Sequence, residues 1–536
     1  MKRIIPYIVL GTLAFCTFSC RPTSDELLSY GQNDSQVFQL AKKSYVEEFK
    51  ALWYAMNENY CIWDYEQKCG LDWDEVYDTY LPKFEEMDKR NGNVTDDELA
   101  STYREFIDQL HDGHMYVEIW NKATGHYLTI NPNEDRNMRE RKDRFLSEAT
   151  NITNLDAYRQ GSVEAKYRVK SFDAASAGLT VAEKVDTVLV RVVHAADTYI
   201  AAVEAAGGPT GLYDSLYNNV VHLKEHAENL HKIIQNAPTI ALEEDLSTLV
   251  KQYNALCARY SLAADQIGVT MEQIEQQMAA DGLKSLRFAL FEGNIAYLRI
   301  AAFRLTPHLD PAYRTTDTSS MYYAYQTAVN RVWHHWFDTI QTLHANGQLG
   351  GVILDLRNNG GGLVNDYQYA LGALLPSGGW ASHTMRTKNG SGRLDFSPLT
   401  PFYVPTYPDE HAVITQEPIV VLANSLSGSL AENTTWGVTS QPNGYFIGTR
   451  TYGALSALST DPQFYSETYS GAFGVKHETA VYGFIPKFVC LYEEDLHPVE
   501  GYGFVPDKDT PLDIDLWKST GRDNQLETAL DYIQSK

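Results

Sequence analysis

One stretch constrains the fold more than any other: Pro418–Gly437, which reads PIVVLANSLSGSLAENTTWG. Its first part, Ile419–Ala423, is a short apolar run of the kind that forms a buried strand. Small and polar residues follow, and the apolar spacing of Leu430, Trp436 and Val438 is typical of a helix. We therefore predict a strand, a tight turn that carries serines, and a helix.

The serines of this turn allow two interpretations. Ser427 or Ser429 can be an ordinary N-cap, with a side chain that accepts a hydrogen bond from the first helical turn. A serine in this place can also be a nucleophile, because a helix N-terminus offers free N–H groups and a positive dipole end to developing negative charge. Taken alone, the stretch favours the N-cap, since serine-rich caps are common.

A similar unit precedes this one in the chain. Gly350–Leu356 has the pattern of a buried strand, and Val364–Leu375 has that of a helix. Between them, Gly360–Gly362 lacks the lysine of a phosphate-binding loop and the spacing of a dinucleotide fingerprint, whereas its N–H groups can form an oxyanion hole. Repeated strand, turn and helix units predict an α/β region.

The N-terminal part has a different pattern. Helices are predicted at Gln36–Glu58, Trp73–Phe84 and Asp96–Leu110, followed by a hairpin whose first strand is Met115–Trp120. His114 lies where the third helix gives way to this strand, a position from which a side chain can reach a cleft. For a single histidine, a surface loop remains the simpler interpretation.

The segment from about 150 to 285 shows apolar residues at helical spacing and almost no strand pattern. Turn signals such as Gly207-Gly208-Pro209 separate its periodic runs. We predict a small antiparallel helical bundle for this segment.

The first twenty residues have the pattern of a targeting segment. Met1-Lys2-Arg3 is basic, and Ile4–Phe18 is apolar but too short to span a membrane. The run ends at Ser19-Cys20 and resembles a bacterial lipoprotein signal, in which Cys20 becomes the lipidated first residue. The alternative is plain secretion with cleavage nearby. Both interpretations place the mature protein outside the cytoplasm, and the first places it in the cell envelope, on the periplasmic side or the surface of the outer membrane.

Charge and cysteine content bound the function further. A net charge of −25 over 536 residues argues against nucleic-acid binding, which requires basic patches. Cys61 and Cys69 lie in one short loop, so we predict a disulfide between them in an oxidising compartment. The cysteine spacings do not form a metal motif.

Five separated segments, in order, resemble the C-terminal processing (tail-specific) serine peptidases and their relatives in the tricorn core protease. Their family patterns are L-x-D-x-H, D-L-R-x-N-x-G-G, a serine-rich nucleophile element ending in Glu, E-G-x-G-x-x-P-D and G-x-D-x-Q-L. In this chain they are Leu110–His114, Asp355–Gly362, Asn424–Glu432, Glu500–Asp507 and Gly521–Leu526.

The resemblance implies a fold and a set of site residues. Ser429 aligns with the nucleophile, and the N–H groups of Gly361, or its neighbour Gly362, and of Leu430 align with the oxyanion hole. The fold would be the α/β superhelical core that this family shares with the ClpP/crotonase group. No metal or cofactor is implied.

Two departures from the family change the expected mechanism. Processing peptidases use a Ser-Lys dyad, but Ala454 stands in the place of the lysine and cannot accept a proton. Tricorn-type relatives use a histidine of the L-x-D-x-H element as base, which here is His114. Gly113 replaces the serine that would orient this histidine, and Glu500 is the candidate for the orienting glutamate.

The second departure is the absence of a strand-rich segment for the usual PDZ domain. The expected division is therefore a signal peptide at 1–20, a tether at 21–35, an N-terminal helical domain with a hairpin at 36–148, a helical-bundle insert at 149–285 and the peptidase core at 286–536.

We therefore predict an exported, lipid-anchored serine endopeptidase that hydrolyses peptide or protein substrates through an acyl-enzyme on Ser429. Two rival hypotheses remain, a non-catalytic peptide-binding lipoprotein on a peptidase scaffold and an esterase that uses the same serine. The sequence leaves the oligomeric state open.

Overall fold

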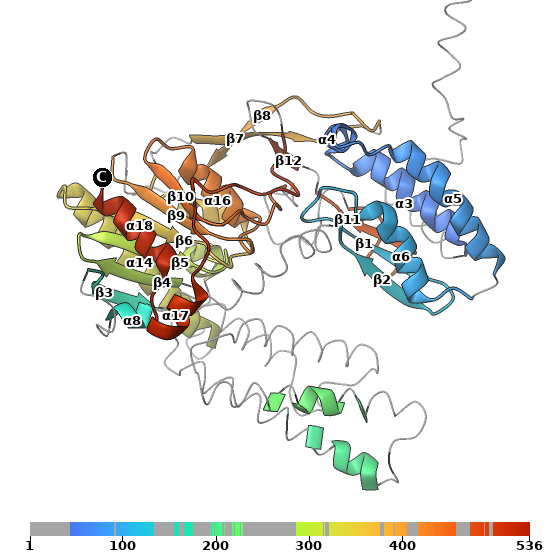
Figure 1. Ribbon diagram of the computed structural model, residues 1–536, viewed down its shortest axis with the longest axis horizontal. Helices are drawn as coiled ribbons and strands as arrows, with labels where there is room; N and C mark the ends of the chain where they lie inside the picture. Colours follow the sequence, from blue (N-terminus) through green and yellow to red (C-terminus); the bar gives the residue numbers. More distant parts are fainter. Residues whose placement is uncertain are drawn as a thin grey trace, which may run out of the picture. The chain divides into compact units, whose positions relative to one another are not determined.

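The computed structural model divides into two compact units (Figure 1). The first unit comprises Met1–Asp135, Arg386–Leu399 and Ser456–Val489, and the second comprises Arg136–Met385, Thr400–Leu455 and Cys490–Lys536. The structure describes residues 43–90, 93–132, 155–159, 166–174, 286–314, 316, 321–375, 380–390, 392–404, 416–456, 472–486, 488–491 and 497–536, with scattered positions between 193 and 228.

The first unit combines helices with a three-stranded antiparallel sheet of order β11-β1-β2. Its elements are α3 (Tyr45–Asn59), α4 (Trp63–Lys68), α5 (Trp73–Lys89), α6 (Asp96–Ile107), β1 (Tyr116–Asn121), β2 (His126–Ile130) and β11 (Val481–Phe484). The helices predicted at Trp73–Phe84 and Asp96–Leu110 and the hairpin are confirmed, whereas the helix predicted at Gln36–Glu58 begins at Tyr45, with Ser44 as its N-cap. Aromatic side chains fill the core, where the Trp53 and Trp73 indoles each donate a hydrogen bond to the other residue's carbonyl, at 2.7 and 3.3 Å.

The second unit is built on a seven-stranded sheet of order β13-β10-β9-β6-β5-β4-β3. Its strands are β3 (Val169–Ala174), β4 (Leu286–Phe291), β5 (Ile295–Ile300), β6 (Gly351–Asp355), β9 (Ile419–Ala423), β10 (Gly444–Gly448) and β13 (Lys508–Asp509). The strands from β5 to β13 pair in parallel, and β4 is antiparallel to both of its neighbours. The loops that follow β6, β9 and β10 therefore leave from one edge of the sheet.

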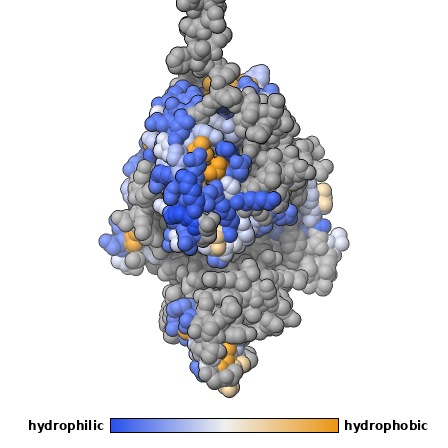
Figure 2. Space-filling view, turned by 90° about the vertical axis from the view of Figure 1, so that its right-hand side faces the viewer, coloured by the Kyte–Doolittle hydropathy of each residue, from blue (hydrophilic) through white to orange (hydrophobic). Residues whose placement is uncertain are grey.

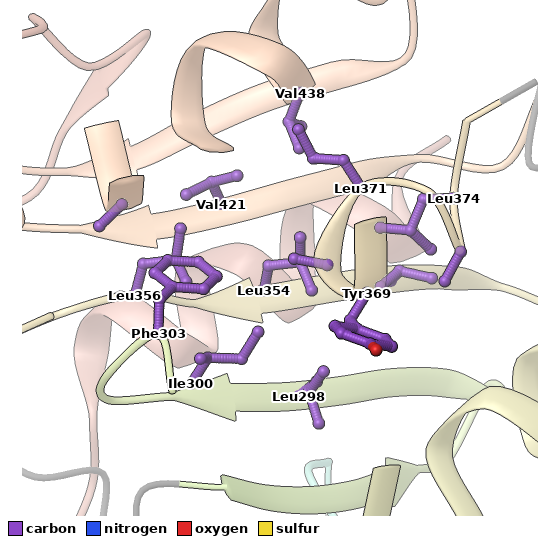
Figure 3. Close-up of a cluster of buried hydrophobic side chains, with 14 of the residues drawn as sticks. Leu298, Ile300, Phe303, Leu354, Leu356, Tyr369, Leu371, Leu374, Val421 and Val438 are labelled. Atoms are coloured by element: carbon purple, nitrogen blue, oxygen red, sulfur yellow. The ribbon is translucent and has the colours of Figure 1, made fainter. Parts of the chain in front are cut away.

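Both faces of this sheet are covered, which explains why its central strands are apolar without interruption. Alternate residues face opposite sides, so that Leu354 and Val421 belong to one buried cluster and Ile353 and Val420 to another. Figure 3 shows the first cluster, in which side chains of β5, β6 and β9 meet Leu371 and neighbouring apolar residues. The sheet is thus the middle layer of three.

The helices form the two outer layers. Helices α14 (Met321–Ala345), α15 (Tyr367–Ala370) and α16 (Leu430–Thr439) contribute to the first cluster, and α8 (Leu155–Arg159) and α18 (Asn524–Gln534) to the second. The remaining elements are α13 (Thr306–Leu309), η4 (Pro311–Tyr313), η5 (Val364–Asp366), α17 (Ile514–Thr520) and a three-stranded sheet of β12 (Phe488–Leu491), β7 (Trp380–Thr387) and β8 (Thr400–Val404). The predicted mixed α/β core is confirmed.

A fully buried arginine fixes the end of β6. The Arg357 guanidinium pairs with Asp355 at 2.7 Å and with Asp523, the N-cap of α18, at 2.8 Å, and it also donates to Gln525 at 2.8 Å. Burial opposes ionisation of Asp355, but the guanidinium outweighs it and holds the pKa of that carboxyl below its ordinary value. Two segments of the family resemblance, far apart in the sequence, therefore meet here.

The structure corrects the expectation of a strand-free insert at 149–285. Strand β3 lies within that segment and pairs with β4 at the edge of the large sheet. Helical residues are present between 193 and 228, as predicted. The part of the predicted bundle from 229 to 285 lies outside the described residues, as do the signal segment with Cys20 and the tether.

The predicted disulfide between Cys61 and Cys69 is wrong, because both residues are thiols in the structure. Helix α4 lies between them, and its six residues rise about 9 Å. The Cα atoms of a disulfide are at most about 7 Å apart. The helix therefore keeps buried Cys61 away from exposed Cys69.

Candidate active site

Ser429 lies at a sharp turn between strand β9 and helix α16. It occupies the N-cap position of the helix, but its φ of 54° and ψ of −119° differ from the extended conformation usual for an N-cap. A non-glycine residue in such a conformation stores about 1–3 kcal/mol of strain. Strained strand-to-helix turns of this kind expose the nucleophile in α/β-hydrolases. The Ser429 side chain is half-buried at the carboxyl edge of the sheet.

Hydrogen bonds join this turn to the turn that follows β6. Asn424 accepts from the Asn358 N–H at 3.0 Å and donates its amide to the Asn358 side chain at 2.7 Å. The Ser427 hydroxyl donates to the Leu356 carbonyl at 2.8 Å, and the Gly428 N–H donates to the Asn359 carbonyl at 2.9 Å. Ser427 is therefore a buried structural serine, and Ser429 is the serine that the turn presents.

Glycine at position 361 permits the two turns to approach this closely. Its φ is 98°, and a Cβ atom there would lie 2.5 Å from the Ser429 Cβ and 2.9 Å from the Leu430 nitrogen. Contacts this short do not occur for real side chains, so no larger residue fits without displacing the serine.

The predicted oxyanion donors near Ser429 differ in whether their N–H groups already make a hydrogen bond. The Gly361 N–H already donates to the Asn359 side chain at 2.8 Å. Among the described residues, neither the Leu430 N–H nor the Gly362 N–H has an acceptor. The two glycines predicted as alternatives therefore differ, because the Gly361 N–H is already engaged by Asn359.

A buried carboxylate lies under the turn. Glu432 is fully buried in the first turn of α16 and accepts the Ser429 N–H at 3.2 Å. From the loop after β10 it accepts the Thr451 hydroxyl at 2.5 Å and the N–H groups of Gly453 and Ala454 at 2.8 and 2.7 Å. Burial raises the pKa of Glu432 to about 7, although these donors lower it in part, and the charge of Glu500 adds to the rise.

The position aligned with the family lysine is occupied by a buried methyl group. Ala454 is almost fully buried, and only its backbone N–H takes part in the site. Arg450, a possible substitute cation, has its guanidinium 4.6 Å from the ring centre of Tyr502. Glu500 is buried and accepts the Leu455 N–H at 2.9 Å.

His114 belongs to the first unit and is described within it. It is half-buried in the loop between α6 and β1, and its N–H donates to Asp112 at 2.9 Å, as does the N–H of Met115 at 2.8 Å. Three residues before His114, the ring of His111 pairs with the buried carboxylate of Glu66 at 2.8 Å. Two buried carboxylates therefore fix the backbone of the L-x-D-x-H element.

Sequence reasoning did not assign the residues that hold the nucleophile turn. They are Asn358, Asn359, Asn424, Ser427, Glu432 and Thr451. All but Thr451 lie inside the two motif segments that contain Gly361 and Ser429. The motif segments therefore already contained these residues, but sequence spacing alone does not show which turn each side chain contacts.

Comparison with known families agrees with this geometry. Residues 294–478 match the model of peptidase family S41. This segment of the chain is therefore similar to the S41 peptidases. Family S41 consists of serine-type peptidases, which makes the core that of a serine-type peptidase. The matched segment contains Ser429, Leu430 and the glycine turn, whereas His114 and Glu500 lie outside it.

The chain also matches solved structures, among them the following three. A putative peptidase from Parabacteroides merdae is 14% identical, with a TM-score of 0.46, and the alignment covers 91% of this chain and 96% of that one. Mature CPAF in complex with lactacystin is 12% identical, with a TM-score of 0.42 and coverage of 93% and 98%. A putative S41 protease from Bacteroides fragilis is 17% identical, with a TM-score of 0.30 and coverage of 45% and 54%. No curated protein matches significantly.

The close approach of the two turns gives a matched pair of variants. We expect Gly361→Ala to reduce modification of Ser429 by a serine-directed fluorophosphonate at least about 100-fold, because the new Cβ displaces the serine and its oxyanion donors. Gly360→Ala adds the same methyl group where nothing lies within 4 Å. The second-order rate of probe labelling measures both variants. Equal rates for Gly361→Ala and Gly360→Ala would show that the close approach has no part in the site.

Proposed function

We propose that this protein is an exported serine endopeptidase that cleaves peptide bonds through an acyl-enzyme on Ser429. The observation that carries the proposal is the strained turn that holds Ser429 at the N-terminus of α16, in close approach to the glycine turn at Gly361. N–H groups in such a place stabilise the oxyanion of a tetrahedral intermediate. The family of the core supports the same chemistry.

In the proposed mechanism, His114 is the general base. It takes the Ser429 hydroxyl proton while the Oγ atom attacks the carbonyl carbon of the peptide bond. The oxyanion is held by Leu430 and Gly362, and the C–N bond breaks as His114 returns the proton to the leaving amine. Water, deprotonated by His114, then releases the acyl group and regenerates the serine.

Two features support a histidine rather than a lysine as the base. Ala454 has no group that can accept a proton, and among the described residues no lysine takes its place beside Glu432. An imidazole with a pKa near neutrality can act first as base and then as acid. Glu500 is proposed as the carboxylate that orients His114, on the basis of its place in the E-G-x-G-x-x-P-D element.

The main rival is a non-catalytic peptide-binding protein on the same scaffold. The loss of the lysine favours it. The strain at Ser429 opposes it, because a binding protein gains nothing from holding a serine in an unfavourable conformation. An esterase with the same serine would share the acyl-enzyme and differ in the leaving group.

Labelling with a fluorophosphonate probe tests the proposed enzyme. We expect wild-type protein to be labelled at Ser429, with no labelling of Ser429→Ala and a loss of about 100-fold or more for His114→Ala, since general-base catalysis contributes 10²–10⁴-fold. Mass spectrometry of the labelled peptide gives the position. Peptide and ester substrates then separate the endopeptidase from the esterase.

His111→Ala is the matched control, because it removes an imidazole from the same segment. A greater loss of labelling in His111→Ala than in His114→Ala would show that His114 is not the base. Folded wild-type protein that stays unlabelled from about pH 6 to about pH 9, where a histidine base becomes neutral, would favour the peptide-binding rival.

We further propose that Cys20 carries a lipid that anchors the protein in the cell envelope. The basic start, the short apolar run and Ser19-Cys20 support this location. Of the helices that the structure describes, none is both long enough and apolar enough to cross a membrane. On the face shown in Figure 2, the described residues are mainly hydrophilic, with small hydrophobic patches between them.

Substitution of the cysteine tests the anchor. We expect Cys20→Ser to abolish incorporation of radiolabelled palmitate and to move the protein from the membrane fraction to the soluble fraction, because one or more acyl chains supply the membrane affinity. Cys16→Ser changes a cysteine in the same segment and should leave both unchanged. Membrane retention of Cys20→Ser without label would contradict the lipid anchor.

A further inference from the structure

Glu432 links the nucleophile turn to the loop in which the family lysine is missing. Its two oxygens share four donors, of which the Ser429 N–H belongs to the turn. The other three, from Thr451, Gly453 and Ala454, belong to the loop after β10. The side chain is fully buried, so water does not compete for these contacts. One carboxyl group therefore connects Ser429 to the residue that stands in the place of the lysine.

We propose that Glu432 is a positioning residue whose ionised form holds Ser429 in its strained, reactive conformation, so that protonation of Glu432 switches the nucleophile off. The inference rests on the proposed function of Ser429 and deepens it, because it names a second group that controls the reaction. Glu432 acts through the backbone of Ser429 and does not contact the substrate.

The hydrogen-bond geometry favours the ionised form. A carboxylate can accept all four donors, because it has two oxygens and about four lone-pair sites. A protonated carboxyl group turns one of its acceptor sites into a donor, which then faces an N–H or O–H group of the protein. Bonds to an ionised acceptor are also roughly twice as strong as neutral ones. Protonation therefore loosens the contact with Ser429, whose backbone strain is then free to relax.

The residues around Glu432 bring its pKa into the neutral range. Burial opposes the charge of Glu432 and brings its pKa to about 7, while Thr451 and the amides of Gly453 and Ala454 favour the charged form. The titratable group that faces it from another segment is Glu500, whose negative charge opposes ionisation. Among the described residues, no ion pair joins a cation to Glu432, and Arg450 has its guanidinium over Tyr502.

Ala454 stands in the place of the family lysine and also contacts Glu432. With alanine in place of the lysine, the loop contributes no proton acceptor, but its backbone N–H still binds Glu432 at 2.7 Å. The loop is thus retained as a support for the nucleophile turn after losing its catalytic side chain. Two groups, the proposed base His114 and Glu432, must then both be deprotonated for reaction.

The pH dependence of fluorophosphonate labelling tests this requirement. We expect the wild-type rate to fall about 100-fold per pH unit well below neutrality, since two protons must be lost. In Glu432→Gln, which cannot ionise, the rate should fall only about tenfold per unit, from a plateau at least about tenfold lower. Glu48→Gln is the matched control, because Glu48 is another fully buried glutamate with a raised pKa, in helix α3 of the other unit. Its profile should keep the wild-type slope.

A second variant covers the case in which Glu432→Gln does not fold. The Thr451 hydroxyl favours the ionised form of Glu432, so Thr451→Val should move the acid limb of the labelling profile to higher pH. A purely structural role for Glu432 would lower the rate equally at all pH values and leave the slope and the limb unchanged. That outcome in both variants overturns the inference.

Hydrogen exchange separates failure of this inference from failure of the proposed function. In wild-type protein at about pH 8, the amides of Ser429, Gly453 and Ala454 should be protected, and Glu432→Gln should remove that protection while Glu48→Gln does not. Loss of protection in a protein that never reacts with the probe would support the positioning role and refute the proposed enzyme. Labelling of wild type with unchanged exchange in Glu432→Gln would refute the positioning role alone.

Discussion

The conformation of Ser429 depends on the hydrogen bonds that join the turn after β9 to the turn after β6. A serine with φ of 54° and ψ of −119° would relax in an isolated peptide, since the strain exceeds thermal energy. The reciprocal pair of Asn358 and Asn424 and the contact of the Gly428 N–H with Asn359 hold the backbone in place. The strain is therefore maintained by polar contacts outside the reacting group, as expected of a built nucleophile site.

These contacts require the parallel sheet that supports them. Strands β6, β9 and β10 are adjacent and parallel, so their carboxyl ends deliver three loops to one edge. Arg357 fixes the first of these loops to helix α18 through buried ion pairs. Removing one partner of such a pair costs about 3–5 kcal/mol, because it leaves a buried charge uncompensated. The far C-terminal segment thus takes part in holding the site, although it contributes no reacting group.

Much of this arrangement could be predicted from the sequence. Continuous apolar runs predicted β6 and β9, and helical spacing predicted α3, α5 and α6, because burial on one or both faces imposes those periods. The order of the motif segments singled out Ser429 and the glycine turn. The pairing of β3 with the large sheet and of β11 with β1 could not be predicted, since both join residues that are distant in the chain. The engagement of Gly361 N–H by Asn359 and the four contacts of Glu432 depend on side-chain directions that spacing does not contain.

A crystal structure of the protein after reaction with a peptidyl phosphonate would test the central claim most directly. The account predicts a covalent bond from phosphorus to the Ser429 Oγ atom, with one phosphonyl oxygen about 2.7–3.1 Å from the Leu430 nitrogen, the range required of an oxyanion donor. It also predicts that Ser429 keeps its positive φ in the adduct. Attachment to any other residue, or a phosphonyl oxygen that points away from Leu430, would contradict the account.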